Sequence, residues 1–282
     1  MKISVVTPSY NQARFVDATM RSIHDQAYQD LEHIVIDGGS TDGSVEIIAG
    51  YADRLASWVS EKDDGQTDAL IKGFARATGD IYCWLNSDDL FEPYTLAEVA
   101  EFFSRHPEAR FVYGDSTWID AAGRPFKPKR EHGWNRFVWM YDHNFIPQPS
   151  AFWRADLYHQ VGGLDRRFDL AMDADLWIRF AEVTTPHHVR RRWSRMRFYP
   201  EQKNTKLRGA SGVEGREIRA RYEAPRSAGE ERLRRFAARG LRVGLKALAG
   251  GYSLAEARRH SGTILGRGTW EEQEARRAGE GR

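Results

Sequence analysis

The stretch that decides the fold is TGDIYCWLNSDD, residues 78–89. Its apolar run, residues 81–85, is short and rich in aromatic and branched side chains, which is typical of a buried strand in a parallel sheet. Ligands of open α/β sheets bind outside the carboxyl ends of the strands, so we expect Asp88 and Asp89 to lie at the binding crevice. The alternative is that Asp89 caps a helix starting near Pro93.

Composition limits the class of protein. The 282 residues are 41% hydrophobic and 12% aromatic, which suits one enlarged α/β domain with an appendage. A formal charge of +2 argues against a globally basic nucleic-acid binder. The single cysteine, Cys83, excludes a disulfide framework and indicates a reducing compartment. No apolar run reaches the ~18 residues of a spanning helix, and the first apolar run is too short for a signal peptide, so we expect a soluble, cytoplasmic protein.

Strands and helices alternate through the first half of the chain. Apolar runs predict strands at 3–7, 33–36, 56–60, 81–85 and 110–113. Helical spacing predicts helices at 13–26, 67–77 and 93–106, with a further helix ending at Ala49. Short links between alternating elements favour a doubly wound, mostly parallel sheet. Right-handed crossovers then place the loops after the strands along one edge.

Polar side chains follow three of these strands. They are Asp37, Asp63, Asp64, Asn86, Asp88 and Asp89. Since the carboxyl ends of parallel strands share one edge, we expect these groups to converge. The first loop lacks G-x-G-x-x-G and no P-loop is present, so a nicotinamide cofactor is not expected.

Three segments, taken together, resemble the successive signatures of glycosyltransferase family 2. They are VVTPSYN at 5–11, IDGGSTDG at 36–43 and LNSDD at 85–89. The resemblance covers roughly residues 1–207 and implies the GT-A fold, a single Rossmann-like sheet. The family's metal motif is Asp-x-Asp, and this chain has Asn86-Ser87-Asp88. The resemblance therefore implies that Asp88 binds Mg²⁺ or Mn²⁺, with Asp89 as a further candidate.

The resemblance also implies a nucleoside diphosphate-sugar donor, which we expect to be a UDP-sugar. The implied donor-binding residues are Thr7, Pro8, Ser9, Tyr10, Asp37, Asp63, Gly65, Asn86, Ser87 and Lys203. Residues 197–206 are similar to a segment that closes over the diphosphate in the family. Within that segment, a solvated Lys203 is the alternative to a phosphate contact.

The segment AMDADLWIR, residues 171–179, resembles the acceptor side of the family, where an acidic residue opens a helix and acts as the catalytic base. By position that residue is Asp173. Asp175 points about 200° away on a helix, so only one of the two can face the site. Without the motif set, Asp173 would be a carboxylate favoured by the helix dipole. Gln148 is a further candidate on the acceptor side.

Composition changes after Gly209, where aromatic residues become rare and Arg and Glu more frequent. We expect a catalytic domain at 1–208, with a nucleotide-sugar half at 1–115 and an acceptor half at 116–208. A basic helical extension would follow at 209–282, with a charged end that we expect to be disordered.

Residues 231–249 predict an amphipathic helix with leucines on one face and Arg or Lys on the other. Such a helix could pack on the catalytic domain, form a homodimer contact, or bind peripherally to the inner face of the membrane.

We therefore expect an inverting glycosyltransferase that moves a sugar to a hydroxyl of a glycan or lipid-linked acceptor, in the synthesis of a surface polysaccharide or glycolipid. Asn86 and Met172 replace carboxylates common in the family, which favours as an alternative a catalytically weak sugar-nucleotide binding module. A nucleotidyltransferase is a second alternative. It would release pyrophosphate, whereas a glycosyltransferase releases a nucleoside diphosphate.

Overall fold

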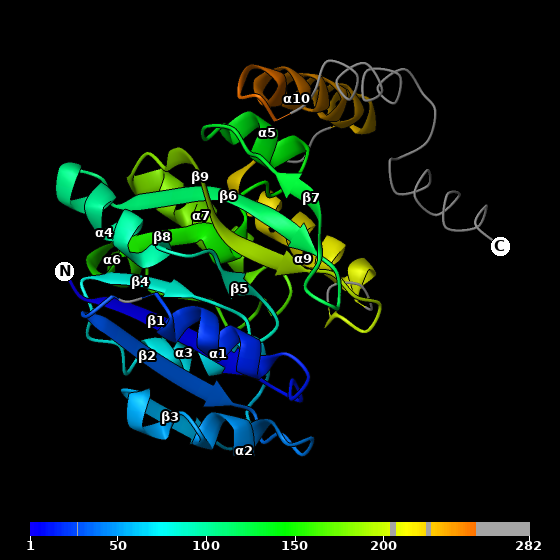
Figure 1. Cartoon of the computed structure of the whole chain (residues 1–282). Coiled ribbons are helices and arrows are strands. Elements are labelled where there is room, and N and C mark those ends of the chain that lie inside the picture. The colour runs from blue at the N-terminus through cyan, green and yellow to red at the C-terminus, as the bar shows by residue number, and fades with distance from the viewer. Residues whose placement is uncertain (27, 204–206, 224–226, 252–282) are drawn as a thin grey trace. The chain divides into compact units, whose positions relative to one another are not determined.

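The computed structural model describes residues 1–26, 28–203, 207–223 and 227–251 (Figure 1). The end of the chain predicted to be disordered lies outside these residues. The chain divides into two compact units: residues 1–129 with 146–223, and residues 130–145 with 224–282. The predicted boundary at residue 208 falls where a helix of the first unit begins.

The first half of the chain forms the parallel part of the sheet, as predicted. Its elements are β1 (Ile3–Ser9), α1 (Val16–His24), β2 (Leu31–Asp37), α2 (Ser44–Ala49), the 3₁₀ helix η1 (Ala52–Arg54), β3 (Ser57–Ser60), α3 (Gln66–Phe74) and β4 (Ile81–Trp84). The strands lie in the order β3-β2-β1-β4, all parallel. Ser9 pairs with Asp37, and Asp37 with Ser60. The ends of these three strands are therefore level at one edge of the sheet.

The second half completes the sheet in a less regular way. Its elements in the first unit are β5 (Leu90–Phe91), α4 (Thr95–Arg105), β6 (Phe111–Ile119), β7 (Pro125–Lys129), the 3₁₀ helix η2 (Gln148–Ser150), β8 (Ala151–Arg154), α6 (Ala155–Gln160), α7 (Met172–Val183), β9 (His187–Arg197) and α9 (Arg208–Tyr222). Strand β8 lies between β4 and β6 and is antiparallel to both. Strand β9 is parallel to β6, and β5 and β7 add antiparallel pairs. The predicted α/β class with a mostly parallel sheet is confirmed.

A cluster of buried aromatic rings fixes α7 against the sheet. Trp177 of α7 stacks on Trp84 of β4, with ring centroids 5.5 Å apart, and on Phe111 of β6 at 4.9 Å. Trp153 of β8 meets the Trp177 ring edge-on at 5.3 Å. Each fully buried ring contributes about 1.5–3 kcal/mol. The cluster therefore holds the helix that carries Asp173 against the strand that leads to Asn86.

The second unit contains α5 (Arg136–Tyr141) and α10 (Ala228–Leu248). Asn135 caps the start of helix α5, and its side chain accepts a hydrogen bond from Val138 N at 3.0 Å. The amphipathic helix predicted at 231–249 is present as α10. Among the described residues, no helix combines the length and apolarity needed to cross a bilayer.

Candidate functional site

The loop after β2 is organised by the Asp37 carboxylate, which is fully buried. It accepts hydrogen bonds from Gly39 N at 3.1 Å, Ser40 N at 2.8 Å, Ser40 Oγ at 2.5 Å and Ser60 Oγ at 2.7 Å. These bonds tie the glycine-rich turn to the end of β3. Asp37 therefore fixes the shape of the loop in which the resemblance places the nucleoside.

The end of β1 supplies the other predicted nucleoside contacts. Thr7, Pro8 and Ser9 are buried, and the Thr7 hydroxyl lies 2.9 Å from Nε2 of the buried His33. Ser9 Oγ is buried and has no hydrogen-bond partner among the described residues. The next side chain, Tyr10, is 62% exposed. The strand thus ends with a buried hydroxyl able to take a ligand and an exposed ring able to stack on a base.

The loop after β3 packs closely on the loop after β2. A Cβ on Gly38 would lie 2.8 Å from Asp63 Oδ2, so a larger residue would push the Asp63 carboxylate away from this loop. Asp63 also accepts a hydrogen bond from Gly65 N at 3.0 Å. Burial raises the pKa of Asp63, and the carboxylates of Asp68 and Asp37 add to the effect. Gly65 has a φ of +106° and turns the chain into α3.

Asn86 is the centre of a hydrogen-bond hub beyond β4. Its Oδ1 accepts from Gln66 Nε2 at 2.7 Å, and its Nδ2 donates to Gln148 Oε1 at 3.1 Å and to Asp89 Oδ2 at 3.5 Å. Gln148 Nε2 in turn donates to Trp84 O at 2.8 Å. An aspartate at this position could not donate to Gln148 or Asp89. The amide therefore joins α3, η2 and the carboxylate pair.

Asp88 and Asp89 are both buried, and the end of β9 and the segment that follows it contact them. Tyr199 OH donates to Asp88 Oδ2 at 2.9 Å, and Arg197 N donates to Asp89 Oδ1 at 2.8 Å. Arg197 Nε donates to Asp88 O at 2.8 Å, and its Nη1 reaches Asp120 O and Ala121 O, both at 3.1 Å. Asp89 does not cap the next helix, because α4 begins only at Thr95. Ser87, between Asn86 and Asp88, is buried as well.

The ionised forms of Asp88 and Asp89 repel each other. Burial raises the pKa of Asp88, and burial together with the charge of Asp88 raises the pKa of Asp89 well above its usual range. Hydrogen bonds from Tyr199 and the positive charge of Arg197 act in the other direction. A further positive charge beside the pair would lower both pKa values and relieve the repulsion.

Asp173 occupies the first turn of α7 and is partly exposed. Its Oδ1 accepts a hydrogen bond from Ala174 N at 2.7 Å. The loop before it is held by Glu214 of α9, which accepts from the backbone amides of residues 169–171 at 3.3, 2.9 and 2.8 Å. Glu214 therefore helps to fix the start of α7, which carries Asp173 in its first turn.

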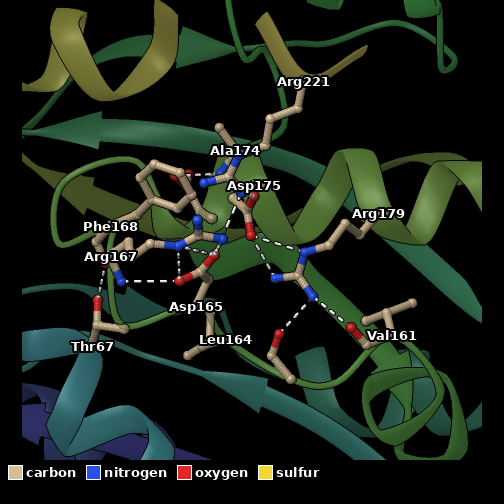
Figure 2. A network of polar contacts seen from close by, with 12 residues as sticks. Thr67, Val161, Leu164, Asp165, Arg167, Phe168, Ala174, Asp175, Arg179 and Arg221 are labelled. Carbon is tan, nitrogen blue, oxygen red and sulfur yellow. Dashed lines mark hydrogen bonds and ion pairs between the residues drawn. The ribbon is translucent and has the colours of Figure 1, made fainter. Parts of the chain in front are cut away.

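Asp175, the other candidate on α7, is fully buried in an ion-pair network (Figure 2). Its Oδ2 accepts from Arg179 Nε at 2.9 Å and Nη2 at 2.6 Å, and its Oδ1 accepts from Arg221 Nη1 at 3.2 Å. Arg179 also donates to the carbonyls of Val161 and Gly163. These contacts make Asp175 a link between α7, α9 and the preceding loop.

Hydrogen bonds connect the donor-side loops with the loop before Asp173. Thr67 Oγ1 donates to Phe168 O at 2.6 Å, as Figure 2 shows, and Thr67 N donates to Asp169 Oδ1 at 3.3 Å. The neighbouring Gln66 is the partner of Asn86. Lys203 Nζ donates to Asp169 Oδ2 at 2.6 Å and to Asp169 O at 3.0 Å, so its ammonium is paired with a carboxylate. The start of α3 thus joins the Asn86 hub to the segment that carries Asp173.

Several residues of this site were not predicted from the sequence. Tyr199, Arg197, Gln66 and Glu214 all contact predicted residues or their loops. Arg197 and Tyr199 both belong to residues 197–206, the segment predicted to close over the diphosphate, so the sequence pointed to this segment but not to these two side chains. Glu214 lies in a helix rich in charged residues, and nothing local distinguishes it from its neighbours.

Comparison with known proteins identifies a family and relatives to which the chain is similar. The model of the family "Glycosyl transferase family 2" matches residues 4–168. An uncharacterized glycosyltransferase of Mycobacterium tuberculosis (strain H37Rv) is 30% identical over 194 residues, which are 67% of this chain and 72% of the relative. A PGL/p-HBAD biosynthesis glycosyltransferase of Mycobacterium bovis BCG is 31% identical over 194 residues, covering 66% and 73%. The O-antigen biosynthesis protein RfbC of Myxococcus xanthus is 30% identical over 192 residues, but only 15% of its length is covered.

Solved structures show the same fold at low sequence identity. S. aureus TarS 1–349 in complex with UDP-GlcNAc has a TM-score of 0.60 at 16% identity, covering 86% of this chain and 81% of that one. Another TarS crystal structure is covered only over 41% of its chain. The mannosyltransferase PcManGT of Pyrobaculum calidifontis, in complex with GDP-Man and Mn²⁺, has a TM-score of 0.61 at 18% identity, covering 99% and 79%. These neighbours are glycosyltransferases of the GT-A fold. Since the family model matches more than half of the residues, the chain belongs to glycosyltransferase family 2.

Proposed function

We propose that the protein is an inverting glycosyltransferase that uses a UDP-sugar and an acceptor hydroxyl in the synthesis of a surface polysaccharide or glycolipid. The observation that carries this proposal is the run of contacts from Asn86 through Gln66 and Thr67 to Phe168. It joins the loops that would hold the donor to the loop that leads to Asp173. Structural neighbours in complex with UDP-GlcNAc and GDP-Man support a nucleotide-sugar donor.

The donor would lie at the carboxyl ends of β1, β2 and β3. Tyr10 offers an exposed ring for the base, and the Ser9 hydroxyl offers a buried hydrogen-bonding group. Asp37 and Asp63 act by holding the two loops around this position. Lys203 would contact a phosphate only after leaving Asp169, because the two are paired in this structure.

A divalent cation fits the chemistry of the carboxylate pair. No described group of three or more His, Cys, Asp or Glu side chains forms a complete protein site. Mg²⁺ and Mn²⁺ prefer oxygen ligands, and Mg²⁺ commonly uses one or two carboxylates together with substrate phosphates, so Asp88 would be the protein's ligand to the ion. The Mn²⁺ in the complex of PcManGT supports this assignment. Bound there, the ion would stabilise the negative charge that develops on the departing diphosphate.

Asp173 would act as the general base in a single displacement. The acceptor oxygen forms a bond to the anomeric carbon while the bond from that carbon to the diphosphate breaks, and the acceptor proton passes to the Asp173 carboxylate. UDP leaves with the bonding electron pair, and no covalent intermediate with the protein is needed. Asp175 is unsuited to this role because both of its oxygens are bound to arginines.

The experiment is a panel of nucleotide sugars with Mn²⁺, read first as thermal stabilisation and then as release of UDP. A ligand at about 100 times its Kd stabilises the folded protein by about 2.7 kcal/mol. Donor binding without UDP release would favour the sugar-nucleotide binding module, and release of pyrophosphate would favour the nucleotidyltransferase.

Asp173→Asn tests the base directly. We expect kcat to fall by about 10²–10⁴-fold while donor affinity stays close to that of the wild type, because the carboxylate acts only in the transition state. Asp156→Asn, which changes an exposed carboxylate elsewhere, is the matched control. Turnover near the wild-type level in Asp173→Asn would remove Asp173 from this role.

A further inference from the structure

Helix α10 packs within the second unit through its charged face. It begins with a capping box, in which Ser227 Oγ accepts from Glu230 N at 3.3 Å and the Glu230 carboxylate accepts from Ser227 N at 3.2 Å. Figure 1 shows α10 running beside α5, which belongs to the same unit. Because polar groups make this contact, the apolar face of α10 is left on the other side of the helix.

Basic residues of α10 pair with groups in residues 130–145, on the side of the helix where Lys246 and Ala238 are buried. Lys246 Nζ lies 2.7 Å from Glu131 Oε2, and both side chains are buried. Arg242 pairs with Asp142, and Arg239 Nε lies 3.7 Å from Asp142 Oδ1. Arg234 Nη1 lies 3.1 Å from Tyr141 OH. Acidic and phenolic groups of the same unit therefore pair with most of these basic side chains.

The opposite side of α10 is an apolar stripe. Its large members are exposed: Leu233 by 67%, Phe236 by 50%, Leu241 by 40% and Leu248 by 83%. The small residues between them are Ala237, Gly240, Gly244 and Ala247. At 100° per residue these eight positions fall within about 140° of the helix circumference. A Cβ on Gly240 or Gly244 would meet no atom within 4 Å, so in the part of the chain that the structure describes nothing covers this stripe.

The net positive charge around the apolar stripe indicates which kind of surface binds it. Residues 227–251 carry six Lys or Arg and two Glu, and residues 130–145 carry two of each sign. The exposed Arg232 lies along the edge of the stripe beside Phe236. A second copy would bring the same positive excess against itself, whereas an anionic surface would complement it.

We propose that α10 docks on an anionic lipid surface. Its apolar stripe enters the boundary between head groups and acyl chains, and Arg232 faces the anionic head groups. This is how an amphipathic helix that does not span the bilayer binds in the plane of the interface. The inference is independent of the proposed sugar transfer.

The test is co-sedimentation of the full chain with vesicles of phosphatidylcholine containing about 30% phosphatidylglycerol, a strongly anionic surface. We expect binding to anionic vesicles and little to phosphatidylcholine alone. Raising salt from roughly 0.1 to 1 M shortens the Debye length from about 10 to 3 Å and should release the protein. The double variant Leu233→Ser, Leu248→Ser should lower the partition coefficient at least tenfold, because each leucine buries about four apolar carbons in the interface.

The matched control is Val213→Ser, which changes an exposed apolar residue (55%) on α9 of the first unit and should bind like the wild type. Equal binding by the wild type and the double variant would overturn the proposal. So would a wild-type dimer in analytical ultracentrifugation that the double variant abolishes, since the stripe would then join two copies. A fall in melting temperature in the double variant would place the stripe in packing within the chain, with the same consequence.

Discussion

The Tyr199 hydroxyl and a cation bound to Asp88 would compete for the same carboxylate. The Tyr199 hydroxyl donates to Asp88 Oδ2 at 2.9 Å, and the Gln202 side chain also hydrogen-bonds this carboxyl group. Burial and the neighbouring Asp88 raise the pKa of Tyr199, so the phenol keeps its proton and remains a donor. A cation that takes this carboxylate must displace the phenol. We therefore expect Tyr199→Phe to bind Mn²⁺ more tightly than the wild type.

The size of the effect follows from the hydrogen bond that is removed. A hydrogen bond to a charged group contributes about 1.5–3 kcal/mol, and each 1.4 kcal/mol corresponds to a tenfold change in affinity. Removing the hydroxyl should therefore lower the Kd for Mn²⁺ by about ten- to one-hundred-fold. The gain should vanish in Asp88→Asn, because the phenol and the cation compete for that carboxylate. The variant that carries both Tyr199→Phe and Asp88→Asn completes a double-mutant cycle, which measures how strongly the two side chains are coupled.

The assay is titration of Mn²⁺ followed by its electron paramagnetic resonance signal, in the presence of UDP. Tyr94→Phe removes an exposed phenol elsewhere and serves as the matched control. An unchanged or weaker affinity in Tyr199→Phe would show that the phenol and the cation do not compete, and would refute the reasoning.

Two further predictions concern stability. Burial raises the pKa of Glu32, but hydrogen bonds outweigh this effect and lower it from 4.5 to about 2; the donors are Lys2, Ser4 and Thr78. Because the folded pKa is depressed, the stabilisation is present above about pH 4.5 and is lost as pH falls toward 2. In urea denaturation, Glu32→Gln should cost about 3 kcal/mol at pH 7, and the difference from the wild type should shrink on acidification. Asp175→Asn should destabilise by about 2–4 kcal/mol by breaking a buried ion pair, and should keep kcat.

The controls for these predictions use exposed carboxylates. Asp30→Asn, whose side chain is exposed beside the N-terminus, should show neither the loss nor the pH dependence of Glu32→Gln. A Glu32→Gln difference that is constant from pH 7 to pH 3 would contradict the linkage argument. For Asp175, a large loss of kcat in a folded variant would contradict its assignment as a structural link between α7 and α9.

The sequence predicted the parallel half of the sheet because each signal there is local. The run 81–85 contains β4, and the glycine-rich turn after Asp37 lies in its predicted place. The insertion of β8 between β4 and β6 was not predicted, since pairing between strands far apart leaves no mark within either strand. Prediction placed the strand at 110–113 in the sheet without identifying β8 as its neighbour.

In the candidate site, too, the residues within local motifs could be predicted and their distant partners could not. Asn86 and Asp88 are visible in the motif, but the partners that give them their roles come from distant segments. Tyr199 lies 111 residues from Asp88 in the sequence. The orientation of α10 was also hidden. Leucines on one face usually indicate the packed side, and only the placement of Glu131 and Asp142 reveals that the basic face packs instead.

The position of β8 has a consequence for synthesis of the chain. Strand β4 can pair with β1 as soon as it is made, but its other edge waits for β8, about 70 residues later. At ~5–20 residues per second, this delay is roughly 4–14 s. During that time the nascent chain presents an open strand edge next to tryptophan-rich segments, a template for pairing with other chains. A chaperone that shields this edge on the ribosome should therefore raise the yield of soluble protein more than one added after release.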